Sequence, residues 1–115
     1  MFFITLLIEQ TQEAIFDLCR KYGVVRLEVF GSAASDTFDP ERSDVDFLVD
    51  FTPGQDLGPW LKHYFEFKEA LEKLLGRPVD LVMGKAVTAA SPYFLREVNR
   101  TRKLIYETQV SEMAR

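Results

Sequence analysis

The stretch that decides the fold is Leu27–Phe51, which reads LEVFGSAASDTFDPERSDVDFLVDF. Both of its ends are rich in valine, phenylalanine and leucine, a composition typical of β-strands. The first strand stops at Gly31-Ser32, and the second carries Asp44 and Asp46 at its start. The stretch therefore predicts two strands that bring a glycine-serine turn close to a pair of carboxylates.

The carboxylates follow a pattern that favours a divalent metal ion. Residues two apart on a strand share a face, so the Cα atoms of Asp44 and Asp46 should lie about 6.5 Å apart. Such a pair repels unless a cation lies between its members. A third acid, Asp80, interrupts the apolar run PVDLVM, where an acidic side chain gains no hydration from its neighbours. If the two aspartate-bearing strands pair, three acids converge on one or two Mg²⁺ ions.

The glycine-serine turn adds the means to bind a phosphate group. Gly31 has no side chain, so its backbone can approach a phosphate closely. The Ser32 hydroxyl and nearby N–H groups can then donate hydrogen bonds to the phosphate oxygens. A phosphate site beside a metal site predicts metal-dependent phosphoryl-transfer chemistry.

These elements resemble the minimal nucleotidyltransferases of the DNA polymerase β superfamily, whose pattern is an apolar strand, Gly-Ser, Ser-Asp-x-Asp and a later strand aspartate. The matched segments cover most of residues 27–83. The resemblance implies that Asp44 and Asp46 ligate the metals, and that Asp80 completes the catalytic metal site and accepts the proton of the attacking hydroxyl. It also implies two Mg²⁺ ions, with Mn²⁺ as a substitute, ATP as substrate, and nucleotide binding by Gly31, Ser32 and Ser43.

One segment departs from the family pattern. Many members read Gly-Ser-x-Ala-Arg-Gly, whereas this chain has Ala34-Ser35-Asp36 in place of Ala-Arg-Gly. The change removes a cation that could steady a phosphate and adds a negative charge. It leaves the three aspartates of the predicted metal site intact.

The resemblance implies transfer of AMP from ATP to a hydroxyl, with the acceptor supplied by a partner. In similar proteins that partner is a HEPN-type toxin adenylylated on tyrosine by its antitoxin. Two alternatives stay open: a non-catalytic antitoxin or scaffold that neutralises its partner by binding, and nucleotidyl transfer to RNA or a small molecule.

Bulk properties are compatible with a small cytoplasmic enzyme. We expect one domain over residues 1–115, with the catalytic motifs within 27–83 and a frayed tail over 107–115. Because so short a chain buries a small core, we also expect that a homo- or hetero-oligomer would stabilise it. A net charge of −4 argues against nonspecific nucleic-acid binding. The single cysteine excludes an internal disulfide and a zinc-cysteine cluster. The apolar start, MFFITLLI, is too short to span a membrane.

The periodicity predicts an α/β (α+β) fold, a small mixed sheet backed by helices as in the polymerase-β-like nucleotidyltransferases. We expect helices over 7–22, 57–75 and 91–101, and strands over 27–30, 45–51 and 78–83, with Gly23 and Gly76 ending the first two helices.

Three further features carry weaker predictions. Asp50 is expected at a solvated strand end rather than as a fourth metal ligand. The aromatic residues of the long helix cannot all face one core, so some are candidates for a partner-binding patch: Trp60, Tyr64, Phe65 and Phe67. The basic residues near the end are expected on a solvated face: Arg96, Arg100, Arg102 and Lys103.

Overall fold

The computed structural model describes residues 3–31, 44–84 and 91–108. Its elements, in chain order, are α1 (Phe3–Gln10), α2 (Gln12–Tyr22), β1 (Val24–Phe30), β2 (Val45–Phe51), the 3₁₀ turn η2 (Pro59–Leu61), α3 (Lys62–Leu75), β3 (Val79–Met83), α5 (Pro92–Thr101) and β4 (Lys103–Glu107). None of the helices in these three ranges is long and apolar enough to cross a lipid bilayer.

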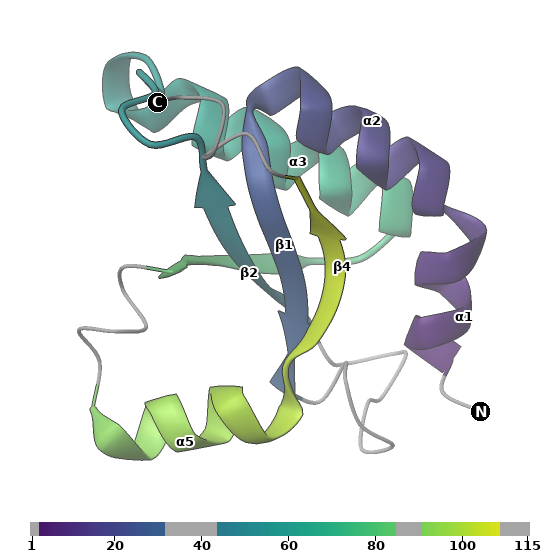
Figure 1. The fold of residues 1–115 in the computed structure, drawn as a ribbon. Helices are drawn as coiled ribbons and strands as arrows, with labels where there is room; N and C mark the ends of the chain where they lie inside the picture. The colour runs from purple at the N-terminus through teal and green to yellow at the C-terminus, as the bar shows by residue number, and fades with distance from the viewer. Residues whose placement is uncertain (1–2, 32–43, 85–90, 109–115) are drawn as a thin grey trace.

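The four strands form one mixed sheet in the order β3-β2-β1-β4. The strand β1 pairs antiparallel with β2 and with β4, whereas β2 and β3 run parallel. Figure 1 shows α2 and α3 side by side over one face of this sheet, with α5 beyond the end of β1 where β4 begins. The predicted small mixed sheet backed by helices is therefore confirmed.

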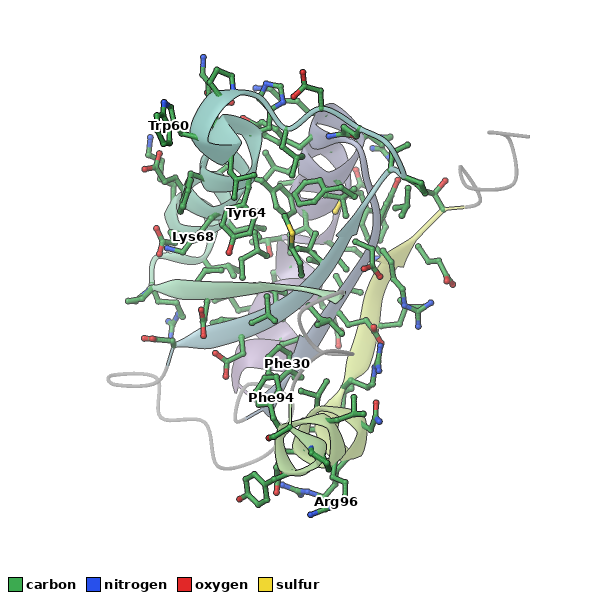
Figure 2. All side chains as sticks on the ribbon, turned by 90° about the vertical axis from the view of Figure 1, so that its left-hand side faces the viewer. Phe30, Trp60, Tyr64, Lys68, Phe94 and Arg96 are labelled. Atoms are coloured by element: carbon green, nitrogen blue, oxygen red, sulfur yellow. The ribbon has the colours of Figure 1, made fainter. Side chains whose placement is uncertain are left out.

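Alternation along the strands divides the apolar side chains between two cores. The larger core joins α2 and α3 to one face of the sheet, and its fully buried members include Ile15, Leu27, Phe47 and Phe67. The smaller core lies on the opposite face, where Phe30 and Leu48 pack under Val98 of α5. Phe30 and Phe94, labelled in Figure 2, pack edge to face with ring centroids 6.1 Å apart. Among the described residues, α5 is the helix that covers part of this second face.

The helix predicted over 7–22 is in fact two helices that meet at Thr11. The Thr11 hydroxyl donates to the Leu7 carbonyl at 2.9 Å, a side-chain bond of the kind that bends helices. The predicted stop is confirmed, because Gly23 ends α2 in the left-handed conformation with φ of 73°.

The long helix begins later than its hydrophobic pattern predicts, at Lys62 rather than near Leu57. Trp60 and Leu61 have positive φ values of 55° and 56°, which break the helical path just before α3. Its end is as predicted, with Gly76 at φ of 69°. The helix predicted from Ser91-Pro92 to Thr101 is also confirmed, and the Ser91 hydroxyl caps it by accepting from the Phe94 amide.

The strand β4 was not predicted, and its presence corrects two expectations. Glu107 is the last residue of β4, and the Thr108 amide donates to the Val25 carbonyl at 3.0 Å, so the frayed tail cannot begin at residue 107. The rest of that predicted tail, 109–115, lies outside the described residues. Arg102 is not part of a solvated basic face, because it bonds Glu28 at 2.5 and 3.0 Å.

Glu28 is the one buried charged residue among those the structure describes, with an exposed fraction of 3%. Its carboxylate accepts hydrogen bonds from Arg102 and from Arg26, which also pairs with Glu107. Burial by itself would raise the pKa of Glu28, but the bonds from Arg102 and Arg26 outweigh it and lower the pKa. The network therefore fastens β4 and the end of α5 to β1.

We expect Glu28→Gln to lower the free energy of unfolding by about 2–3 kcal/mol at neutral pH, since it weakens hydrogen bonds between buried charged groups. A lowered folded-state pKa means that the carboxylate stabilises the fold above its unfolded pKa and loses this effect as the pH falls. Urea unfolding at pH 7 and at pH 3.5 should thus show a difference that shrinks on acidification. Asp17→Asn, which breaks only an exposed pair with Arg20, should change little.

Candidate active site

Two of the predicted metal ligands lie side by side on the partly covered face of the sheet. Asp46 of β2 is the direct register partner of Asp80 on β3, and its partner on β1 is Phe30. Neighbouring strands are about 4.8 Å apart, so the two carboxylates project from adjacent backbones. Both share the sheet face of Leu48 rather than that of Phe47. The fold therefore brings together two acids that are far apart in sequence.

Asp46 is held in an environment that disfavours its charge. It is half-buried, and burial, followed by the negative charges of Asp80 and Asp44, raises its pKa from 3.8 to about 6. Asp80 is exposed and open to solvent. A divalent cation would relieve both the repulsion and the loss of solvation at Asp46.

Asp44 lies just before β2 and is exposed. It is close enough for its charge to act on Asp46, but the described residues hold no group of three or more Asp, Glu, His or Cys side chains arranged as a complete metal site. The donor set still fits Mg²⁺, which takes hard oxygen ligands and fills its remaining positions with water and substrate phosphate oxygens. Asp46 and Asp80 are the residues that would hold it, with Asp44 at their side.

The turn that leaves β1 touches the same carboxylate. Gly31 has φ of 72°, and a Cβ placed on it would lie 2.8 Å from Oδ2 of Asp46. Only glycine combines this backbone conformation with such a close approach. The Gly31 amide donates to the Thr101 hydroxyl at 2.8 Å, so it is not free to bind a phosphate itself. The close approach seen here is to Asp46, and the predicted approach of the Gly31 backbone to a phosphate stays a prediction.

The remaining predicted nucleotide-binding residues, Ser32 and Ser43, lie outside the described residues, as does the departure at Ser35 and Asp36. Asp50 is described and is half-buried, not fully solvated as predicted. A Cβ on Gly84 would lie 2.1 Å from its Oδ1, so Asp50 packs against the backbone at the end of β3 rather than beside Asp46.

Tyr64 of α3 also lies close to the acids. Its hydroxyl donates to the carbonyl of Leu81, the residue after Asp80, and burial together with the charge of Asp80 raises its pKa. Figure 2 shows Tyr64 pointing from α3 toward β3. On the same helix, Glu72 accepts from the Val79 amide at 3.0 Å. Side chains of α3 therefore form hydrogen bonds with the Val79 amide and the Leu81 carbonyl of β3, which is an edge strand.

The aromatic residues of η2 and α3 do not all face the core, as predicted. Phe67 is fully buried in the larger core, whereas Trp60 is 94% exposed and Phe65 50% exposed. Figure 2 shows Trp60 directed away from the sheet, at the end of α3 far from Arg96. Trp60 and Phe65 thus remain the exposed aromatic residues of this segment, and Tyr64 has a structural contact.

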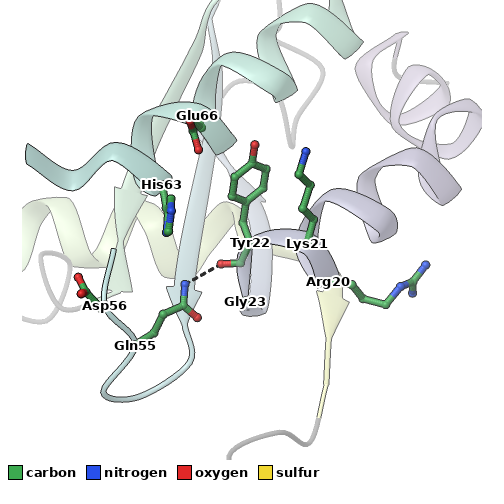
Figure 3. A pocket seen from close by; sticks show the side chains of 8 residues that line it. All are labelled: Arg20, Lys21, Tyr22, Gly23, Gln55, Asp56, His63 and Glu66. Carbon is green, nitrogen blue, oxygen red and sulfur yellow. Dashed lines mark hydrogen bonds between the residues drawn. The ribbon is translucent and has the colours of Figure 1, made fainter. Parts of the chain in front are cut away.

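A cavity of about 550 Å³ lies away from the acids, where α2 ends and α3 begins. Figure 3 shows Gln55 beneath it, donating to the Tyr22 carbonyl at 2.8 Å, with His63 and Glu66 across from Tyr22. Neither Asp46 nor Asp80 lines it. Gly23 at this cavity precedes β1 and Gly31 follows it, so the cavity and the acids lie at opposite ends of that strand.

The sequence did not predict the bond of Thr101 to Gly31 or the bond of Tyr64 to Leu81, the neighbour of Asp80. No pattern marks Thr101, because its role depends on α5 returning to the end of β1. Tyr64 has the helical spacing of a core residue, and only the position of β3 beside α3 brings its hydroxyl near Asp80.

Comparison with known sequences identifies the family. The nucleotidyltransferase domain profile matches residues 12–110. Two proteins of Methanocaldococcus jannaschii, both named "Putative protein adenylyltransferase", are 38% identical over 89 residues and 36% identical over 86 residues. The first alignment covers 77% of this chain and 82% of the relative, and the second covers 75% and 79%.

Solved structures agree with this assignment. A structure described as a "putative minimal nucleotidyltransferase" is 35% identical and superposes with a TM-score of 0.62, covering 84% of this chain and 90% of that chain. A toxin-antitoxin complex with AMP-PNP shares the fold at 24% identity and a TM-score of 0.60, covering 90% and 78%. A chain of the structure described as "tri-AMPylated Shewanella oneidensis HEPN toxin in complex with MNT antitoxin" shares the fold too, at 21% identity and a TM-score of 0.57, covering 92% of this chain and 77% of that chain. With its mixed sheet, its paired aspartates and these relatives, the chain belongs to the nucleotidyltransferase domain family, as its sequence predicted.

Proposed function

We propose that this protein transfers AMP from ATP to a tyrosine hydroxyl of a HEPN-type partner protein, in the cytoplasm and in a Mg²⁺-dependent reaction. The observation that carries the proposal is the pairing of Asp46 with Asp80, with the Gly31 turn against the Asp46 carboxylate. The adenylyltransferase names of the archaeal relatives and the HEPN complexes among the structural neighbours support the choice of substrate and partner.

In this reaction the acceptor oxygen forms a bond to the α-phosphorus of ATP, and the bond to the β-phosphate oxygen breaks, releasing pyrophosphate. Asp46 and Asp44 would hold a Mg²⁺ ion, and Asp80, the exposed register partner of Asp46, would complete that metal site and accept the proton of the hydroxyl. Mg²⁺, when bound, would lower the pKa of the hydroxyl and offset the negative charge of the leaving group. The Gly31 turn positions the phosphates beside these acids.

The test uses ATP labelled on the α-phosphate, Mg²⁺ and a HEPN-type protein, to be sought first among the products of the neighbouring genes. We expect the wild type to label that protein, and Asp80→Asn to lose at least about 100-fold in rate while still binding it. ATP labelled on the γ-phosphate should give no labelled protein, because that phosphate leaves with pyrophosphate. Asp50→Asn is the matched control, since Asp50 is an acid on the same sheet face but packs against Gly84.

A partner that remains unlabelled with wild-type protein would contradict the proposal. If Asp80→Asn also protects cells from the partner as well as the wild type does, neutralisation occurs by binding alone, and the non-catalytic alternative replaces the proposal. Label appearing in RNA or a small molecule instead would identify the other alternative.

A further inference from the structure

The last residue of α5, Thr101, is bonded to the turn that contacts Asp46. Its hydroxyl oxygen accepts a hydrogen bond from the Gly31 amide at 2.8 Å. The same hydroxyl donates to the Glu97 carbonyl, 2.9 Å away within α5. A threonine hydroxyl has one proton to donate and lone pairs to accept, so both of its bonding directions are used.

Thr101 is itself held in place on both sides. Before it along α5, Val98 is fully buried and Phe94 packs edge-on against the ring of Phe30. After it, Arg102 bonds the buried carboxylate of Glu28. These contacts fix the position of the Thr101 hydroxyl. The Gly31 N–H must point toward that hydroxyl to keep its hydrogen bond.

The direction of this amide matters because Gly31 itself lies beside Asp46. The Gly31 amide belongs to the peptide plane that follows Phe30, the register partner of Asp46. The turn then passes so close to Asp46 that a Cβ on Gly31 would lie 2.8 Å from Oδ2. Rotation of that peptide plane would change both the path of the turn and its contact with the carboxylate.

We propose that Thr101 is a positioning residue of the nucleotide site, which fixes the Gly31 turn in the conformation that receives the phosphates of ATP. This inference rests on the proposed function. Thr101 acts through Gly31 and does not touch the reacting atoms. Its loss should weaken binding of the phosphates and leave the chemical step little changed, so the effect should appear in KM for ATP rather than in kcat.

The experiment compares Thr101→Val, which keeps the shape but removes the hydroxyl, with Thr101→Ser, which keeps the hydroxyl. We expect Thr101→Val to speed hydrogen exchange of the Gly31 amide at least about tenfold, measured by NMR, and to raise KM for ATP about tenfold, with kcat within about threefold. Thr101→Ser should restore both values. Thr11→Val is the matched control, because the Thr11 hydroxyl donates to the carbonyl four residues before it at 2.9 Å, as that of Thr101 does, and is not near Gly31.

Unchanged exchange at Gly31 in Thr101→Val would overturn the contact, and unchanged KM with faster exchange would overturn its role in nucleotide binding. Equal effects from Thr11→Val would show that only helix stability was altered, which also overturns the inference. A wild-type protein that neither binds nor uses ATP would overturn the proposed function, and the Gly31 exchange rates would still decide whether Thr101 fixes the turn.

Discussion

Asp46→Asn should abolish AMP transfer and at the same time make the metal-free protein more stable. The loss of transfer should reach about 1,000-fold or more, because the neutral amide of this variant would be a poorer ligand for the Mg²⁺ that would offset the charge of the triphosphate. The gain in stability follows from the pKa of Asp46, raised to about 6 by burial and by its two acidic neighbours. At neutral pH the ionised carboxylate destabilises the fold, and the neutral amide does not.

The raised pKa of Asp46 also makes the free energy of unfolding depend on pH. A raised folded-state pKa means that the native protein holds the Asp46 proton more tightly, so stability falls as the pH rises from about 4 to 6. The full shift corresponds to about 3 kcal/mol, and about 1–2 kcal/mol is expected because the half-buried side chain is partly screened by solvent.

Thermal unfolding without metal measures this difference. Asp46→Asn should melt several degrees above the wild type at pH 7, by about 4 °C per kcal/mol, and at the same temperature below pH 4. Millimolar Mg²⁺ should raise the melting temperature of the wild type and leave that of the variant unchanged. Asp50→Asn should give no such gain. A variant no more stable than the wild type at pH 7 would mean that Asp46 is not under electrostatic strain.

The second large effect is expected at the turn. Gly31→Ala places a methyl group 2.8 Å from Oδ2 of Asp46, at a residue whose φ is 72°. The left-handed conformation costs about 1–2 kcal/mol for alanine, and relief of the contact must displace the carboxylate. Because misplacement of a catalytic group by about 1 Å can cost 100-fold in rate, we expect kcat/KM for AMP transfer to fall at least about 100-fold.

Gly76→Ala separates the two effects of that substitution. Gly76 has a similar φ of 69°, but a Cβ there would meet nothing within 4 Å. It should therefore lower the melting temperature by the conformational cost alone, less than Gly31→Ala does, with transfer unchanged. Equal rates in the two variants would show that the close approach to Asp46 has no role in the reaction.

Most of the site could be predicted because its residues break the patterns around them. Asp80 interrupts an apolar run, and Gly31 ends one, so each signals a role beyond packing. The strand pairing of Asp46 with Asp80 was expected for the same reason and is seen as direct register. Strand β2 was predicted to the residue because an apolar run marks it, and helix α5 was predicted to within one residue because Pro92 marks its start.

The rest depended on contacts between distant segments. The strand β4 has a mixed sequence, KLIYE, and is stabilised by pairing with β1 and by the bonds of Arg26 to Glu107 and Arg102 to Glu28. The late start of α3 depends on the positive φ values at Trp60 and Leu61, which neither residue type favours. Such features are set by tertiary structure and leave no local pattern.

The edge position of β3 has a consequence for how an acceptor reaches the acids. A peptide that bound by adding a fifth strand beside Asp80 would have to displace the Tyr64 hydroxyl from Leu81 and the Glu72 carboxylate from Val79. In the described part of the chain, no side chain would have to give up a backbone bond for a group to reach the exposed Asp80 from the sheet face that it shares with Asp46. The acceptor should therefore present a single long side chain, inserted from above the sheet, with its own backbone remaining outside.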